Sequence, residues 1–231
     1  MTKEKSKMKL RKISVMLSCV MLTTFLGGCG NSPDMAGYIS AILDNTFKND
    51  STKFVSMEIG TAEQAAKSYE TTLAGEVDAL IELSDAGPAS DEQRAQMESI
   101  VKDIYAKAKY TVDGAEKQDD GSYVVTVTYE RANVYGNILD AYLADAMELN
   151  DELAEADAAE MPSEAELRET LLNSYIDDFN NALANVTYEK PATATIRVEL
   201  KNQTWQVNSA DFTVFQQNLF DLKAALDSLA Q

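Results

Sequence analysis

Between residues 35 and 105, apolar residues recur at the three- and four-residue spacing of amphipathic helices. One apolar stripe covers residues 35–47, and two more cover residues 65–83 and 97–105. The second stripe follows Thr61–Gln64 and the third follows Ser90–Gln93, and both of these stretches have the pattern of a capping box. The pattern predicts three helices joined by irregular segments.

From residue 110 the apolar spacing shortens to two residues, which is the period of a half-buried strand. Alternation over residues 110–112 and 123–129, on either side of Asp119-Asp120-Gly121, predicts one hairpin. Residues 192–200 and 205–207 predict a second hairpin. One apolar and one polar face on each strand is typical of an antiparallel sheet.

Helical spacing returns between the two hairpins and again after the second. Residues 134–158 and 163–183 carry apolar stripes and predict a helical pair inserted between the hairpins. A single last helix is predicted from Ser209 to residue 229. The chain is therefore predicted to be an α+β protein, with about four antiparallel strands in two hairpins packed against about six helices.

The start of the chain has a different pattern. Residues 1–12 are rich in lysine and arginine, and a largely apolar run follows from Ile13 to Leu26. A basic start, a short apolar centre and small residues at its end are typical of a secretory signal peptide. The run is shorter than the ~20 apolar residues that a membrane-spanning helix needs.

The apolar run ends at Leu26-Gly27-Gly28-Cys29, which resembles the lipobox of bacterial lipoproteins. In that family the cysteine receives a diacylglycerol, and cleavage leaves this cysteine as the first residue. The resemblance implies cleavage between Gly28 and Cys29, with a signal peptide over 1–28, a lipidated tether over 29–33 and a single α+β domain over 34–231. It also implies a lipid anchor in the cell membrane, on the extracytoplasmic face. A plain signal peptide with an incidental cysteine is the alternative.

Three longer segments extend the resemblance over most of the remaining chain. They are GYISAILDNTFKND at residues 37–50, GSYVVTVTYERANVYG at 121–136 and ATATIRVELKNQTWQVNSADF at 192–212. Together with the lipobox they resemble a group of uncharacterised lipoproteins of Firmicutes, especially gut Clostridia. This resemblance implies a cystatin-like or nuclear transport factor 2-like fold, in which a curved antiparallel sheet packs on a helix. Such folds serve enzymes, binders and scaffolds, so the resemblance supplies no functional residue besides Cys29.

Charge and composition narrow the possible chemistry. Residues 1–28 hold six of the 20 basic and one of the 38 acidic residues, so the predicted mature chain carries 14 basic and 37 acidic residues, a net charge of −23. Such a charge argues against nucleic-acid binding. The chain has no histidine, which excludes histidine-based catalysis and histidine metal ligands. Since Cys29 would be lipidated, we expect no disulfide, no cofactor and no metal site.

Two groups of residues are candidate binding surfaces. Tyr110, Tyr123, Tyr129 and Trp205 are expected to share the sheet, where they either face an apolar ligand or peptide or form core against the last helix. The helical pair holds thirteen acidic residues and one base, Arg168, between residues 140 and 178. This surface is interpreted as a solvated face, a weak Ca²⁺ site or a surface for a cationic protein partner.

From these observations we expect a membrane-anchored, non-catalytic binding or interaction module of the cell envelope. The alternative is an envelope hydrolase that uses carboxylates or a Ser–Lys pair. Two carboxyl groups about 5 to 9 Å apart in a deep cleft would favour the hydrolase.

Overall fold

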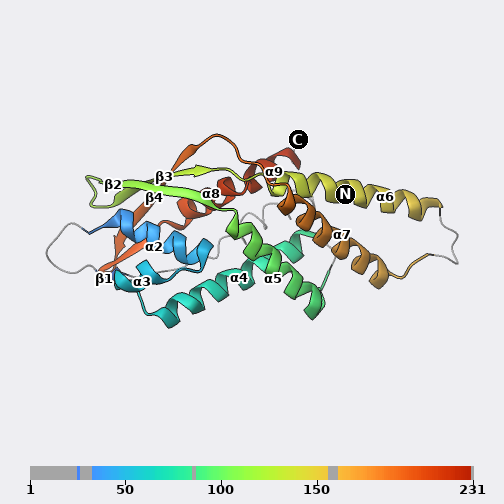
Figure 1. The fold of residues 1–231 in the computed structure, drawn as a ribbon, viewed down its shortest axis with the longest axis horizontal. Coiled ribbons are helices and arrows are strands. Elements are labelled where there is room, and N and C mark those ends of the chain that lie inside the picture. Colours follow the sequence, from blue (N-terminus) through green and yellow to red (C-terminus); the bar gives the residue numbers. More distant parts are fainter. Residues whose placement is uncertain (1–24, 27–32, 85–86, 156–160, 230–231) are drawn as a thin grey trace.

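The computed structural model describes residues 25–26, 33–84, 87–155 and 161–229 and confirms the α+β class (Figure 1). Helices precede, separate and follow two strand hairpins, in the predicted order. The helices are α2 (Met35–Lys48), α3 (Thr52–Ser56), α4 (Ala62–Ser84), α5 (Asp91–Ala106), α6 (Tyr135–Glu155), α7 (Glu164–Ala184), α8 (Ser209–Leu219) and α9 (Leu222–Leu229). The strands are β1 (Phe25–Leu26), β2 (Lys109–Lys117), β3 (Tyr123–Glu130), β4 (Ala192–Lys201) and β5 (Thr204–Val207).

The strands form one antiparallel sheet in the order β1-β5-β4-β3-β2. The two predicted hairpins are β2–β3 and β4–β5, and they join where β3 pairs with β4. In β3 every second residue is buried, which confirms the period-2 interpretation. The register of β2 against β3 shifts between Val112 and Gly114, so the edge strand is irregular at Asp113.

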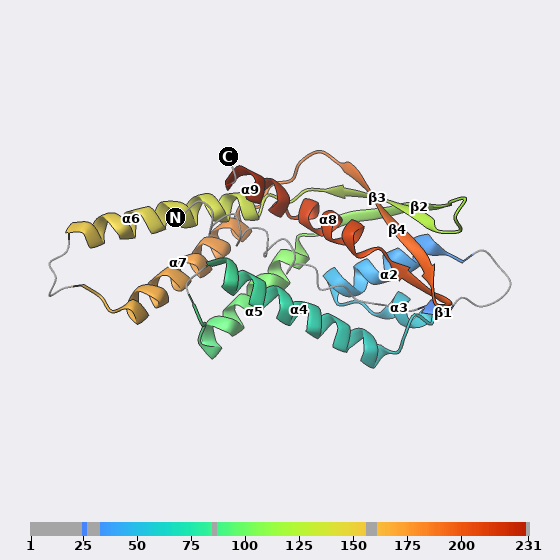
Figure 2. The same cartoon turned by 180° about the vertical axis from the view of Figure 1, so that it is seen from behind.

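The core lies between the apolar face of the sheet and the helices that cover it (Figure 2). Helix α2 contacts β2 and β3, and α8 contacts β4. Helices α4 and α5 pack together, and α2 contacts both. Most of α2 is buried, and Ile39, Ala41 and Leu43 have no exposed surface. The helix therefore lies largely within the core, with part of one face left at the surface.

The capping boxes lie at the N-termini of helices α4, α5 and α7, where the sequence predicts helices to begin. Ser90 and Ser163 each cap a helix through its N3 residue, Gln93 and Glu166 respectively. The Thr61 Oγ1 accepts from the backbone N–H of Gln64 at 3.2 Å, and the Gln64 side chain returns a contact at 2.8 Å. No helix in the described ranges is both long and apolar enough to cross a membrane.

Three local features differ from the sequence-based prediction. The short helix α3 lies in a connection that was expected to be irregular. The prediction of a single last helix is wrong. The chain turns at Asp221, whose φ of 53° separates α8 from α9. The third is β1, a two-residue strand that lies inside the predicted signal peptide and pairs with β5.

Candidate functional site

A polar hollow of about 450 Å³ lies between helix α2 and the edge strand β2. Gly37, Ser40, Asp44 and Lys48 line it from α2, and Tyr110 lines it from β2. Lys53 of α3 lies at the same hollow. Polar and charged groups from three elements therefore meet at one place on the surface.

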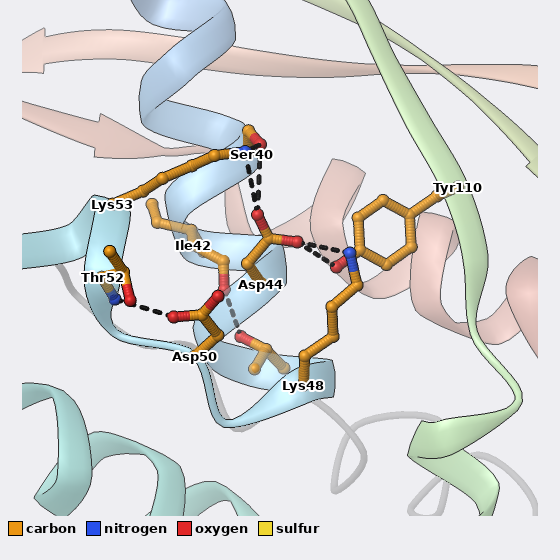
Figure 3. A network of polar contacts seen from close by, with 9 residues as sticks. Ser40, Ile42, Asp44, Lys48, Asp50, Thr52, Lys53 and Tyr110 are labelled. Atoms are coloured by element: carbon orange, nitrogen blue, oxygen red, sulfur yellow. Dashed lines mark hydrogen bonds and ion pairs between the residues drawn. The ribbon is translucent and has the colours of Figure 1, made fainter.

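Asp44 is the centre of the contacts at this hollow (Figure 3). One carboxylate oxygen accepts from the Lys48 Nζ at 2.6 Å and from the Tyr110 hydroxyl at 2.9 Å. The other accepts from the Lys53 Nζ at 3.1 Å and from the Ser40 hydroxyl at 3.4 Å. The carboxylate thus ties α2 to α3 and to β2.

Local sequence places these groups together. Ser40, Asp44 and Lys48 are four residues apart, so they share one face of α2. Asn49, with a φ of 51°, ends that helix in a left-handed conformation and reverses the chain. The Asp50 carboxylate then accepts from the backbone N–H of Thr52 at 2.9 Å at the start of α3. This turn brings Lys53 back to the face of α2.

The electrostatics of the hollow depend on the ionised Asp44. Burial raises the pKa of Asp44, but hydrogen bonds from Lys48, Lys53 and Tyr110 together hold it below its ordinary value. Burial and the neighbouring Asp44 carboxylate raise the pKa of the Tyr110 hydroxyl well above its ordinary value. The Lys48 Nζ lies 4.6 Å from the centre of the Tyr110 ring, within range of a cation–π contact. Tyr110 therefore acts as a neutral donor to a charged acceptor.

The hollow contains a contact between a serine and a lysine, the two residue types that form the nucleophile and base of Ser–Lys hydrolases. The Lys53 Nζ donates to the Ser40 Oγ at 2.7 Å. A general base for serine must instead accept the hydroxyl proton. Here the Ser40 hydroxyl donates to Asp44, and the Lys53 ammonium is paired with the same carboxylate. In this geometry Asp44, and not Lys53, is the acceptor for the Ser40 hydroxyl.

The four aromatic residues predicted to share the sheet occupy two environments. Tyr123, Tyr129 and Trp205 are buried, with Tyr123 against Trp205 and Tyr129 against Phe215 of α8 at ring-centre distances of 5.5 and 5.6 Å. Tyr110 is half-buried and lines the hollow. Gly28 and Cys29 lie outside the described residues.

Among the buried carboxyl groups away from the hollow, Glu76 and Asp178 have strongly raised pKa values. Burial raises the pKa of Glu76 to about 7, against hydrogen bonds from Gln216 and Tyr105 that lower it. Burial, with Asp145 and Asp177 nearby, raises the pKa of Asp178 to about 6. A second polar hollow, of about 380 Å³, lies between α5 and α7 and is lined by Gln93 and Asn173 among others. Glu76 and Asp178 line neither this hollow nor the one at α2. In the described ranges, no group of three or more acidic or cysteine side chains is placed to hold a metal ion.

Sequence reasoning did not select Ser40, Asp44, Lys48 or Lys53. The spacing of Ser40, Asp44 and Lys48 on one face was a usable signal, but an i,i+4 Asp–Lys pair is common on solvated helices. What distinguishes Asp44 is its burial, with 7% of its surface exposed, and its contact with Tyr110, which is 66 residues away in the chain.

Comparison with known proteins gives one distant structural similarity. No family model matches the chain, and no curated protein matches it significantly in sequence. A crystal structure described as that of a "putative lipoprotein (ycdA)" from Bacillus subtilis subsp. subtilis str. 168 superposes with a TM-score of 0.49 at 14% identity. The match covers 80% of this chain and 55% of that one, so the chain spans about half the length of this structure.

Proposed function

We propose that the protein is a lipoprotein anchored at Cys29 on the extracytoplasmic face of the cell membrane, where it works as a non-catalytic binding module. The anchor rests on Leu26-Gly27-Gly28-Cys29, at the end of a basic and then apolar segment. Two or three acyl chains would hold the protein firmly, because each buried methylene contributes about 0.8 kcal/mol. Helix α2 begins at Met35, so the folded body would start within a few residues of the membrane.

One observation carries the non-catalytic part of the proposal. In the hollow at α2, Ser40, Lys48, Lys53 and Tyr110 all direct their polar atoms at the one Asp44 carboxylate. Each potential reactive group is thereby held by a partner within the protein. Such an arrangement supports a rigid surface for binding more than a site for bond making and breaking.

The anchor predicts that Cys29→Ala abolishes lipid attachment. Cells that express the wild-type chain and are fed an alkyne fatty acid should incorporate the label into it. The Cys29→Ala chain should carry no label and should leave the membrane fraction. Ser32→Ala is the matched control, because it alters a neighbouring position and leaves the lipobox intact. Equal labelling of wild type and Cys29→Ala would contradict the anchor.

The 2.7 Å contact between Lys53 and Ser40 favours one other candidate, a Ser–Lys hydrolase. A fluorophosphonate probe, which labels activated serines, distinguishes the two candidates. We expect no labelling of the wild-type chain above that of Ser40→Ala. Labelling that is lost in both Ser40→Ala and Lys53→Met would establish the hydrolase and overturn the non-catalytic proposal.

A further inference from the structure

The helices α6 and α7 extend beyond the rest of the molecule as a two-helix arm (Figures 1 and 2). Close to the body their contacts are dry, because Ile138, Tyr175 and Phe179 have no exposed surface. Farther out, the apolar side chains between the two helices are only half-buried. These side chains, here called the arm seam, are Leu149, Leu153, Leu167 and Leu171.

Two exposed apolar residues lie beside the arm seam, on the neighbouring face of α6. Leu143 is 43% exposed and Met147 is 69% exposed, and the two are four residues apart on the helix. Two helices alone leave one side of their shared apolar stripe open to water, whereas a third helix would cover it. A methionine in such a position adapts its shape to different partners. The arm seam and these two residues therefore form a partly exposed apolar surface of the kind that an amphipathic helix covers.

The charge around the arm seam selects the partner. Helices α6 and α7 together carry eleven acidic residues and one base, Arg168, which is paired with Glu164. A second copy of this chain, with a net charge of −18 over its full length, would be repelled. An anionic membrane surface would be repelled for the same reason. Lysine or arginine beside an apolar face would instead be attracted.

We propose that the arm seam binds a cationic amphipathic helix of a peptide or protein partner. The apolar face of the partner covers Leu143, Met147, Leu153 and Leu167, and its basic residues lie against the acidic edges of the arm. This inference deepens the proposed function, since it rests on the protein being a binding module and names the class of partner. It does not depend on lipidation.

The experiment uses the full chain carrying Cys29→Ser, so that a failure of lipid anchoring and a failure of arm binding are seen separately. The probe is a fluorescent 18-residue peptide of leucine and lysine in an amphipathic helical order, titrated at physiological salt and followed by anisotropy. A scrambled peptide of equal composition has the same charge without an apolar face. We expect the ordered peptide to bind at least about tenfold more tightly than the scrambled one.

The matched variants test the position of the binding site. The double variant Leu143→Gln, Met147→Gln should lower the affinity for the ordered peptide about tenfold, because it removes apolar contacts with the peptide. Both side chains are exposed, so the core should stay intact. Val214→Gln on α8 removes an apolar residue that is 48% exposed elsewhere and should change nothing. Equal binding of both peptides, or unchanged binding by the double variant, would overturn the proposal. So would self-association of the chain that the double variant abolishes.

Discussion

Replacing Asp221 with alanine is expected to destabilise the protein by about 4 kcal/mol. The Asp221 carboxylate caps α6 from outside that helix. One oxygen accepts from the backbone N–H groups of Val134 and Tyr135 at 2.9 and 2.7 Å, and the other from Gly136 at 3.0 Å. Alanine would leave three N–H groups at a helix N-terminus without this acceptor. A β-carbon on Gly136 would lie 3.0 Å from the carboxylate, so the glycine permits this close approach.

Urea unfolding followed by circular dichroism measures the loss. Asp221→Asn keeps the turn and one acceptor oxygen, so it should lose about half as much stability as alanine. Asp227→Ala is the matched control, because it removes an exposed aspartate of the next helix that pairs with Lys223 across one turn. Its cost should stay below about 0.5 kcal/mol. A cost for Asp221→Ala as small as that of the control would contradict the capping role.

Replacing Glu76 with glutamine is expected to stabilise the protein at pH 8 by about 3 kcal/mol. Glu76 is 3% exposed on α4 and accepts from the Gln216 side chain of α8 at 2.6 Å. Burial raises its pKa from 4.5 to about 7. Between these two values the folded state binds more protons than the unfolded state, so stability falls as pH rises through this window. Glutamine keeps the acceptor for Gln216 and removes the buried charge.

The pH dependence separates this effect from general repacking. At pH 5 the carboxyl is largely protonated in the folded protein, so Glu76→Gln should gain less than about 1 kcal/mol there. Asp178, whose pKa is raised to about 6, also makes stability depend on pH. It does so equally in the wild type and in Glu76→Gln, so its effect cancels when their free energies of unfolding are subtracted. Glu82→Gln, at an exposed position of the same helix, should show no such pH dependence. An equal gain at pH 5 and pH 8 would contradict the buried-charge explanation.

The fold class and most helix starts could be predicted because they depend on local patterns. Thr61, Ser90 and Ser163 cap helices through residues three positions away, and period-2 alternation identifies β3 whatever it packs against. The last helix was mispredicted because its apolar spacing continues across Asp221 without a break. The left-handed turn at Asp221 places its carboxylate at the distant N-terminus of α6, and no local pattern records that contact.

The candidate site was the least predictable feature, for the same reason. Asp44 is one of 38 acidic residues, and the residues next to it in the sequence do not distinguish it from acidic residues on solvated faces. Its importance comes from burial beside β2 and from Tyr110, which the hairpin brings to it. The aromatic residues chosen from the sheet pattern were found on the sheet, but the helices that cover each of them could not be read from alternation.

Composition and short-range periodicity are enough to predict the α+β class and the order of helices and hairpins. Composition also gives the large negative charge and the absence of histidine chemistry. The folded structure is needed to show which carboxylates are buried and where Lys53 and Tyr110 meet Asp44. It is also needed to show that the arm seam on the outer half of α6 and α7 is half-buried. These features depend on contacts between residues far apart in the chain, whose burial and pairing no local pattern specifies.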